Sequence, residues 1–401
     1  MTHNRVAITG MGILSSIGFT IEDNLYALLN QKKGIAPIVN IKTRHANEIK
    51  VGEILDTNEQ LAKKLNLPKG HNYSRTALLG CIAAKQAVEH AQIGDDLVDT
   101  RTGLISSTSV GGMDMTEKHF KQYNSNAESN KFIESHNAAD STEKIAQYLG
   151  ITDFTTTIST ACSSAANAIM LGARLIKSGQ LDRVIVGGTD SLAKFTINGF
   201  KSLMILSDTD CTPFDADRKG LNLGEAAAYL VLESDDIVKE KNKNVLAYLA
   251  GYGNANDAFH QTASSENGEG AFLAMKKALQ VADLQPEQIN YINAHGTATP
   301  NNDLSEGRAI KRIFGDIIPD FSSTKAFTGH TLAAAGAIEA VYAVLALQNN
   351  VIFPNLNFNT VMPELGMVPV TKVITKNLDY VLSNSFGFGG NCSSLIFSKS
   401  Q

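Results

Sequence analysis

The chain has 401 residues, of which 43% are apolar and 19% are charged, so it can build a packed core and falls outside the class of disordered proteins. Its formal net charge of −5 gives no global field that would attract nucleic acid or an anionic membrane. The N-terminus shows no signal-peptide pattern, and no uncharged apolar run reaches the roughly 20 residues of a membrane-spanning helix. We therefore expect a soluble, cytoplasmic protein that binds neither nucleic acid nor membrane.

Short apolar, β-branched runs alternate with longer helix-compatible segments, which is typical of an α/β fold whose sheet is covered by helices on both faces. In chain order, the expected strands are residues 6–9, 102–106, 155–159, 183–186, 245–251, 288–293 and 380–384. The expected helices are residues 74–91, 164–177, 270–281, 305–314 and 332–347.

The two halves of the chain look like loose copies of one plan. Each opens with a strand that we expect to end in a glycine-containing turn, RVAITGMG and then VLAYLAGYGNAND. Deeper in each half, a strand passes through a sharp turn into a helix of small residues, which puts Cys162 and His330 in equivalent turns. The acidic, lysine-rich residues 234–244 have the composition of a solvated connector, so we expect halves of residues 1–240 and 241–401.

The four cysteines are scattered without CxxC spacing, which argues against a zinc site and against a disulfide framework. Cys162, in STACSSAANAI, follows a β-branched run and precedes a helix of small residues. We expect its thiol to be exposed at the helix N-terminus, where the helix dipole and free amides favour the nucleophilic thiolate. Free cysteines are often buried in cores, which is our interpretation of Cys81 and Cys211.

Two histidines stand beside glycine at the ends of strand-like runs. His295, in YINAHGTATPNND, precedes a turn that Pro300 and the two asparagines would enforce, and His330, in STKAFTGHTLAAAG, begins an alanine-rich helix. Both lie where α/β folds place active sites, beyond the carboxyl ends of strands. Lys325 lies between a strand and the turn of His330, and we expect it to supply a fixed positive charge there. The other histidines, including His260, lack this context, and we interpret most of them as surface or packing residues.

Near the C-terminus, LDYVLSNSFGFGGNCSSLIFSK predicts a β-hairpin whose loop is FGFGG. Its three glycines permit positive φ and a close approach of the backbone to a ligand. Phe388, between the glycines, could swing or present its amide. A flexible hairpin tip would explain the glycines but not the two aromatic residues.

The strings TACSSA, NAHGTATPNND, KAFTGHTLAAAGAIEA and NSFGFGG occur in an order that resembles the β-ketoacyl-acyl carrier protein synthases, and the resemblance spans nearly the whole chain. It implies a thiolase-like, duplicated αβαβα five-layer fold and a dimer. It also implies acyl transfer to a cysteine, decarboxylation of malonyl-acyl carrier protein (ACP) and Claisen condensation, in fatty-acid or related polyene or polyketide synthesis. The partner ACP would carry the 4′-phosphopantetheine arm, and we expect no metal and no cofactor in the chain itself.

The resemblance assigns the catalytic triad to Cys162, His295 and His330. Lys325 and Glu339 match the family's supporting charged residues. A cysteine is required because it must act both as nucleophile and as leaving group. Two neutral imidazoles would donate N–H bonds to the enolate that forms when malonyl thioester loses carbon dioxide.

The resemblance also assigns binding roles. Thr297 and Thr299 match the family's contacts to the pantetheine arm, and the amides of Cys162 and Phe388 match its oxyanion donors. An acidic carrier protein needs a local basic patch on this acidic chain, and the residues that we expect to supply it are Lys63, Lys64, Lys69 and Arg75.

The sequence departs from the family in three places. The usual Gly-Gly-Thr-Asn is Gly-Gly-Asn-Cys at residues 389–392, which changes the bonding expected within that loop. Thr212 replaces an arginine that commonly precedes Pro-Phe-Asp, so we expect one carrier contact of the family to be absent. His136 and Asp140 stand in residues 132–146, where relatives tend to be apolar, so we expect an acyl pocket near the dimer interface that suits a polar or aromatic group.

Three alternatives stay open. A degradative thiolase would share the fold but needs a second active-site cysteine, for which Cys392 is the only candidate. A chain-length-determining subunit of a heterodimeric synthase typically lacks the nucleophile that Cys162 supplies. A hydrolase of the Cys-His-Asp type is more distant. The sequence does not distinguish a homodimer from a heterodimer with a chain-length subunit.

Overall fold

Strands and helices alternate along the chain in the computed structural model, which describes residues 5–97, 99–123 and 125–400. The strands are β1 (Val6–Ser15), β2 (Ile35–Pro37), β3 (Lys50–Gly52), β4 (Thr102–Ser107), β5 (Phe154–Ile158), β6 (Arg183–Asp190), β7 (Ala226–Ser234), β8 (Ala247–Asn256), β9 (Tyr291–Asn293), β10 (Asp320–Ser322), β11 (Val351–Ile352), β12 (Ile374–Thr375), β13 (Tyr380–Phe386) and β14 (Asn391–Lys399). The α-helices are α1 (Ile21–Leu29), α2 (Asn58–Lys64), α3 (Arg75–His90), α4 (Met113–His119), α5 (Ala127–Ile133), α6 (Ala138–Leu149), α7 (Ser164–Lys177), α8 (Lys194–Ser202), α9 (Asp235–Glu240), α10 (Glu269–Ala282), α11 (Pro300–Phe314), α12 (Lys325–Thr328) and α13 (Ala335–Asn349).

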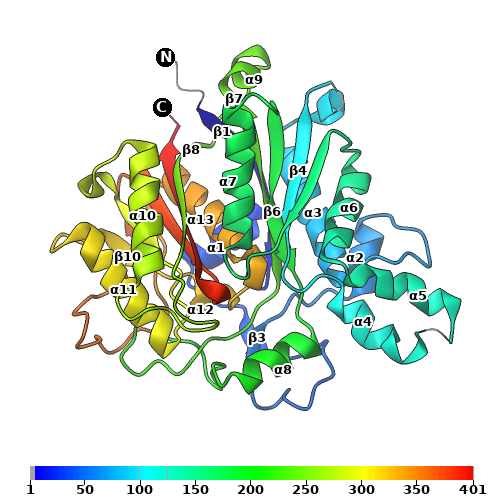
Figure 1. The fold of residues 1–401 in the computed structure, drawn as a ribbon, viewed down its shortest axis with the longest axis horizontal. Coiled ribbons are helices and arrows are strands. Elements are labelled where there is room, and N and C mark those ends of the chain that lie inside the picture. The colour runs from blue at the N-terminus through cyan, green and yellow to red at the C-terminus, as the bar shows by residue number, and fades with distance from the viewer. Residues whose placement is uncertain (1–4, 98, 124, 401) are drawn as a thin grey trace.

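The elements stack into five layers, which confirms the expected αβαβα arrangement. α10 and α11 form one outer layer and α3 with α6 forms the other, while α7 and α13 lie between the two halves of the sheet (Figure 1). α13 packs against both β13 and β7, and a helix that is apolar all round belongs in such a core. The stretch Leu332–Asn349 is long and apolar enough to cross a membrane, but 89% of it is buried inside the fold.

The two β layers of this αβαβα arrangement are joined into one ten-stranded sheet, in the order β10-β9-β13-β14-β8-β1-β7-β6-β4-β5. The junction is a short antiparallel pairing of β1 with β8, over Ala7 with Tyr248 and Ile8 with Ala247. On each side of it, two antiparallel pairings are followed by two parallel ones. The topology therefore contains the expected duplication. The division at residue 240 stays a prediction, because both halves contribute to the core around α7 and α13.

The turns expected at the glycines near the start of each half are wrong, because these glycines lie inside β1 and β8. A Cβ atom on Gly12 would lie 2.1 Å from the carbonyl oxygen of Ala83 in α3. A Cβ atom on Gly253 would lie 2.2 Å from the carbonyl oxygen of Ala274 in α10. Glycine is needed at both positions because a helix backbone packs directly on the strand, and the repeated contact is further evidence of the duplication.

The turn expected after His295 is instead the first turn of α11. Pro300 occupies the first helical position, where its missing N–H removes no helical bond, and the hydroxyl of Thr299 caps the helix by accepting from the amide of Asn302.

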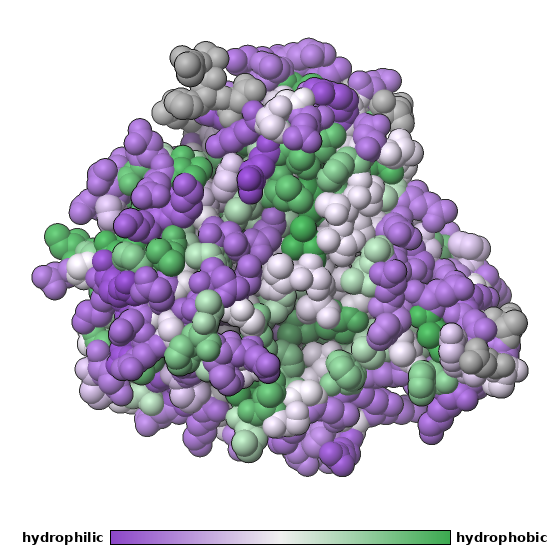
Figure 2. Space-filling view, viewed as in Figure 1, coloured by the Kyte–Doolittle hydropathy of each residue, from purple (hydrophilic) through white to green (hydrophobic). Residues whose placement is uncertain are grey.

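The outer surface is mostly polar on the face drawn in Figure 2. Apolar side chains gather over the middle of this face, between polar flanks. The flanks belong to the outer helices, whose apolar sides pack inward.

Candidate active site

Cys162 lies in a strained turn between β5 and α7. Ala161, the residue before it, has a φ of 52°, in the left-handed region that residues with side chains disfavour. The turn is held by the amide of Thr160, which donates to the hydroxyl of Ser164 over 2.8 Å, and by that hydroxyl, which donates to the carbonyl of Ala161 over 2.5 Å. These bonds fix the thiol at the start of α7.

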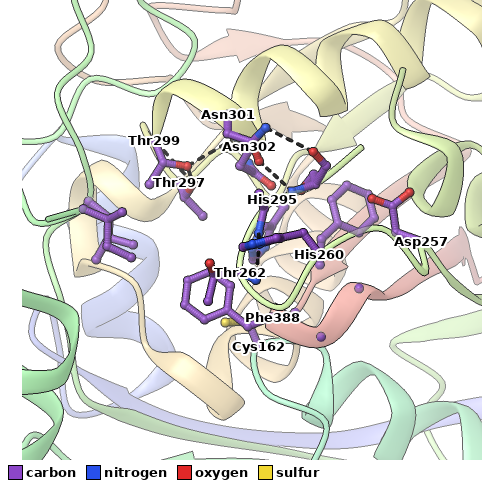
Figure 3. Close-up of a pocket in the computed structure, with 18 of the residues that line it drawn as sticks. Cys162, Asp257, His260, Thr262, His295, Thr297, Thr299, Asn301, Asn302 and Phe388 are labelled. Carbon is purple, nitrogen blue, oxygen red and sulfur yellow. Dashed lines mark hydrogen bonds between the residues drawn. The ribbon is translucent and has the colours of Figure 1, made fainter. Parts of the chain in front are cut away.

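Two imidazoles face this thiol. Nε2 of His330 lies 3.0 Å from Sγ of Cys162, although 168 residues separate them in the sequence. The ring centroids of His295 and His330 are 5.4 Å apart, with the rings nearly perpendicular. All three side chains are buried and border one cavity. Figure 3 shows Cys162 and His295 in this cavity. The structure thus brings together the three residues that the sequence singles out.

A buried ion pair supports the histidines. Nζ of Lys325 lies 3.3 Å from Nδ1 of His295 and pairs with the carboxylate of Glu339. Because an ammonium only donates, Nδ1 of His295 accepts and its Nε2 carries the proton. Burial, together with the charge of Lys325, holds the pKa of His295 and of His330 well below the usual range, so both imidazoles are neutral at pH 7. Burial raises the pKa of Glu339 to about 7, and Lys325 opposes that rise.

Sequence reasoning missed Glu306, which orients the loop of His295. Its carboxylate accepts from the amides of His295 and Gly296 over 2.9 and 2.8 Å and from the side-chain amide of Asn384 over 3.1 Å. Burial raises the pKa of Glu306 to about 7. Its position on α11, eleven residues after His295, is the signal that could have found it, because a helix that follows a strand end can present an acid to the amides there.

The expectation of an exposed Cys162 with a lowered pKa is wrong. The residue is only 6% exposed, and burial raises the pKa of its thiol to about 12. Lys325 and the backbone amide of Phe388, which donates toward the sulfur, act in the opposite direction. The loss of hydration outweighs them because the turn places the sulfur below the surface.

The glycine-rich loop of the expected C-terminal hairpin lies against Cys162. It joins β13 to β14, and Gly389 and Gly390 have φ angles of 83° and 82°, which explains the need for glycine. The ring of Phe388 stacks on that of Phe200, with centroids 5.9 Å apart. Phe388 therefore sets both an amide and an aromatic ring beside the thiol.

Two cavities meet at Cys162, Phe200 and Phe388. The first, of about 280 Å³, contains both imidazoles and is bordered by Thr297 and Thr299, whose hydroxyls are 2.9 Å apart (Figure 3). The second, of about 450 Å³, has a mainly apolar lining that includes Val110, Met113, Phe195, Leu203 and Leu332. Across the described residues, no group of three or more His, Cys, Asp or Glu side chains is arranged to hold a metal ion.

His260, which the sequence analysis sets aside, also borders the first cavity (Figure 3). Its Nδ1 accepts from the amides of Thr262 and Ala263, which fixes the ring at the cavity mouth. Its sequence context gives no signal for this position, because the chain returns to the cavity only after β8 ends.

His136 and Asp140 border neither cavity. His136 is exposed, and its Nδ1 lies 3.1 Å from the hydroxyl of Thr116. Asp140 pairs with Lys144, one turn further along α6, over 2.8 Å. Within one subunit, the fold therefore does not place His136 or Asp140 at the cavities around Cys162.

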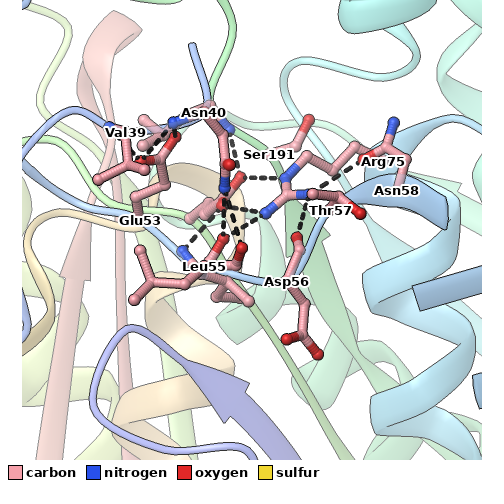
Figure 4. A network of polar contacts seen from close by, with 12 residues as sticks. Val39, Asn40, Glu53, Leu55, Asp56, Thr57, Asn58, Arg75 and Ser191 are labelled. Carbon is pink, nitrogen blue, oxygen red and sulfur yellow. Dashed lines mark hydrogen bonds and ion pairs between the residues drawn. The ribbon is translucent and has the colours of Figure 1, made fainter. Parts of the chain in front are cut away.

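The expectation that Arg75 helps to dock a carrier protein is wrong, because its side chain is buried. It lies in a network of polar contacts (Figure 4). The guanidinium donates to both carboxylate oxygens of Glu225, over 2.7 and 2.9 Å, and to the carbonyls of Ile54 and Asp56. The planar guanidinium matches the geometry of a carboxylate. Because its positive charge is paired inside the fold, it is not available to an acidic partner. The other residues of the expected patch are exposed at and just after α2: Lys63, Lys64 and Lys69.

Comparison with known proteins identifies the family. Residues 3–236 match the family described as "Beta-ketoacyl synthase, N-terminal domain", and residues 246–359 match "Beta-ketoacyl synthase, C-terminal domain". The chain belongs to the β-ketoacyl synthase family.

This β-ketoacyl synthase resembles curated relatives and solved structures over its whole length. It is 34% identical to the 3-oxoacyl-[acyl-carrier-protein] synthase 2 of Staphylococcus aureus (strain N315), over 99% of each chain, and 32% identical to that of Vibrio cholerae, over 100% of each. It superposes on a chain of the ishigamide ketosynthase/chain length factor with a TM-score of 0.93, at 29% identity over 100% of each chain. The ketosynthase ApeO in complex with its chain length factor ApeC, from Xenorhabdus doucetiae, matches with a TM-score of 0.84 at 31% identity, over 99% of this chain and 98% of that one.

Proposed function

We propose that this chain is a β-ketoacyl-ACP synthase that accepts an acyl group on Cys162, decarboxylates malonyl-ACP and joins the two by Claisen condensation. The observation that carries the proposal is the short contact between Nε2 of His330 and Sγ of Cys162, with His295 beside them in one buried cavity. The names of the curated relatives, 3-oxoacyl-[acyl-carrier-protein] synthase 2, support the same reaction.

The first half-reaction transfers the acyl group. The sulfur of Cys162 attacks the carrier thioester, the bond to the pantetheine sulfur breaks, and the proton from Cys162 ends on the released pantetheine thiol. Nε2–H of His330 donates across its 3.0 Å contact to the sulfur of Cys162 as negative charge develops there, and the thiol proton passes to the departing pantetheine sulfur. The amides of Cys162 and Phe388 stabilise the oxyanion of the tetrahedral intermediate.

The second half-reaction needs two N–H donors. Once Cys162 is acylated its sulfur has no proton, and both imidazoles present Nε2–H to the thioester oxygen of the malonyl group. Lys325 fixes this tautomer of His295 by donating to Nδ1. Nδ1 of His330 has no hydrogen-bond partner among the described residues, so no neighbour holds a proton there, and we assign the proton to Nε2.

Carbon dioxide loss then drives carbon–carbon bond formation. The electrons of the broken C–C bond pass to the thioester oxygen as an enolate, which both imidazoles stabilise. The enolate carbon attacks the acyl group on Cys162, and the cysteine leaves as a thiolate that regains a proton. The reaction needs no resident cofactor, because the ACP supplies 4′-phosphopantetheine and hydrogen bonds stabilise each developing charge.

The two cavities suggest where the two parts of the substrate bind. We assign the pantetheine arm to the first cavity, beside Thr297 and Thr299, and the acyl chain to the apolar second cavity. The influence of His136 and Asp140 on the acyl chain stays a prediction that requires a second subunit, since neither borders a cavity of its own chain. An unchanged acyl preference in His136→Ala and Asp140→Ala would contradict it.

We further propose that the partners are an ACP and a second subunit, either another copy or a chain-length subunit, and that the protein acts in the cytoplasm. The solved complex of a ketosynthase with its chain length factor supports the heterodimer. Cys162 and both histidines favour the synthase over a chain-length subunit. Cys392 borders the first cavity, as a thiolase would need, but the two imidazoles favour decarboxylation.

Mass spectrometry of the protein incubated with a panel of acyl-ACPs tests the proposal. We expect one acyl adduct, on Cys162, that disappears when malonyl-ACP is added and β-ketoacyl-ACP forms. Cys81→Ser, which changes a buried cysteine of α3 outside both cavities, is the matched control and should acylate normally. Acylation that persists in Cys162→Ala, or no acylation with any carrier, would contradict the proposal.

A further inference from the structure

Asn391, the first residue of β14, joins the glycine-rich loop to the helix that carries the nucleophile. Its Oδ1 accepts from the hydroxyl of Ser163 over 2.7 Å, from Nδ2 of Asn167 over 2.8 Å and from Nδ2 of Asn254 over 2.9 Å. Ser163 is the residue directly after Cys162, and Asn167 lies one turn further along α7. One side-chain oxygen therefore connects β14, α7 and β8.

These contacts belong to a closed polar network. The hydroxyl of Ser393 donates to Oδ1 of Asn167 over 2.7 Å, and Nδ2 of Asn254 donates to the same oxygen over 3.0 Å. Nδ2 of Asn167 also reaches the hydroxyl of Thr160, in the turn before Cys162. A network whose members satisfy one another in this way holds its residues in one arrangement.

On the side that faces α7, the loop between β13 and β14 is anchored at Asn391. The amide of Gly387 donates to the carbonyl of Asn391 over 2.8 Å, which closes the loop at its base. On the outer side, the amide of Gly389 donates to the carbonyl of Gln261, and the carbonyl of Gly390 accepts from the amide of Asp257. Phe388 lies between these two anchors, so the position of its amide is set by both.

The loop also lies directly on the nucleophile turn. A Cβ atom on Gly387 would lie 2.7 Å from the carbonyl oxygen of Thr160 and 3.1 Å from the amide nitrogen of Cys162. At this distance, a shift of the loop moves the amide of Phe388 relative to the sulfur. The imidazoles of His295 and His330 come from other segments and have no bond to Asn391.

We infer that Asn391 is a positioning residue for the acyl-transfer half-reaction and not for decarboxylation. The inference rests on the proposed function. Asn391 keeps the amide of Phe388 aligned with the thioester on Cys162, whereas the enolate is stabilised by imidazoles that Lys325 and Glu306 orient independently.

Two variants of the full chain test this. Asn391→Ala removes the acceptor and should slow acylation of Cys162 by about 10- to 100-fold, less than the roughly 10²–10³-fold effect of deleting an oxyanion donor. In a Cys162→Gln background, the same change should leave carbon dioxide release from malonyl-ACP unaltered. Asn391→Asp keeps an acceptor for all three donors, so it should preserve the acylation rate at high pH. Its charge raises the pKa of the thiol, so the rise of acylation with pH should move to higher pH.

The control is Asn349→Ala, which removes a surface amide at the end of α13 and should change neither half-reaction. The inference is overturned if Asn391→Ala acylates at the parent rate, or if both half-reactions fall together. Should Asn391→Ala fail to fold, Asn391→Thr and Asn391→Val decide, because they have the same shape and only threonine keeps an acceptor oxygen. Faster acylation by Asn391→Thr, with equal carbon dioxide release by the two in the Cys162→Gln background, supports the inference, and equal acylation rates overturn it. If the parent chain performs neither half-reaction, the proposed function is wrong and this inference falls with it.

Discussion

Lys325 lies between His295 and Glu339, with its Nζ 3.3 Å from Nδ1 of the imidazole and paired with the carboxylate. One buried ammonium therefore selects the imidazole tautomer and supplies the positive charge that helps to keep both histidines neutral. Burial makes the larger contribution to the lowered pKa of His295 and of His330, and the charge of Lys325 comes next.

Removing this charge should change the titration of both histidines. Lys325→Met keeps the length of the side chain but removes the cation, so protonation of His295 and His330 becomes easier and the pKa of each rises toward 6.5. We expect NMR of isotopically labelled histidine to show both rings neutral well below pH 6.5 in the parent and titrating at higher pH in the variant. Lys376→Met, which removes a half-exposed surface partner of Asp320, is the control. Identical titrations in parent and variant would show that Lys325 does not set the protonation state.

Access, and not a lowered pKa, should make Cys162 the most reactive cysteine toward iodoacetamide. All four cysteines are buried and burial raises the pKa of each, but of the four only Cys162 and Cys392 border the first cavity. Peptide mapping should find Cys162 labelled first, Cys392 next, and Cys81 and Cys211 last. Because the thiolate is the reactive form, labelling of Cys162 should keep accelerating above pH 9. A rate that levels off below pH 8 would show that the thiolate already exists in the free protein.

Changes at Arg75 should lower the stability of the fold, whereas changes at the lysines of α2 should weaken ACP binding. Arg75→Met leaves the carboxylate of Glu225 buried without its partner, so the free energy of unfolding should fall by about 3–5 kcal/mol in denaturant titrations. Reversing the charge of Lys63 and Lys64 should leave stability unchanged, weaken ACP binding and reduce its dependence on salt. Carrier affinity and salt dependence that survive the lysine reversal would place the docking surface elsewhere.

The sequence was enough to predict those elements whose conformation is set by residues close to them in the chain. The helix expected at residues 164–177 coincides with α7, because small residues after the Cys162 turn lead into an amphipathic stretch. The hairpin around Phe388 follows from alternating strand residues on both sides of three glycines. The strand-turn-helix context of Cys162 and the glycines beside His295 and His330 likewise marked the residues that meet in the first cavity.

The features that sequence reasoning missed depend on partners far along the chain. β7 begins Ala-Ala-Ala, a composition with low strand propensity, and forms because β1 and β6 pair with it on both sides. The sequence marked Arg75 as a surface charge because its partner, Glu225, lies 150 residues away. The same holds for the burial of Cys162, whose thiol would be exposed if the helix start were its whole environment.

Carbon dioxide release from labelled malonyl-ACP by Cys162→Gln tests the central claim most directly. The amide takes the place of the acyl thioester and leaves both imidazoles intact, so this variant should release carbon dioxide while forming no β-ketoacyl product. Adding His295→Ala or His330→Ala should slow the release by about 10²–10³-fold each, and their combination should cost less than the product, because both act on one transition state. Release at the undiminished rate after loss of either histidine would contradict the mechanism proposed for this site.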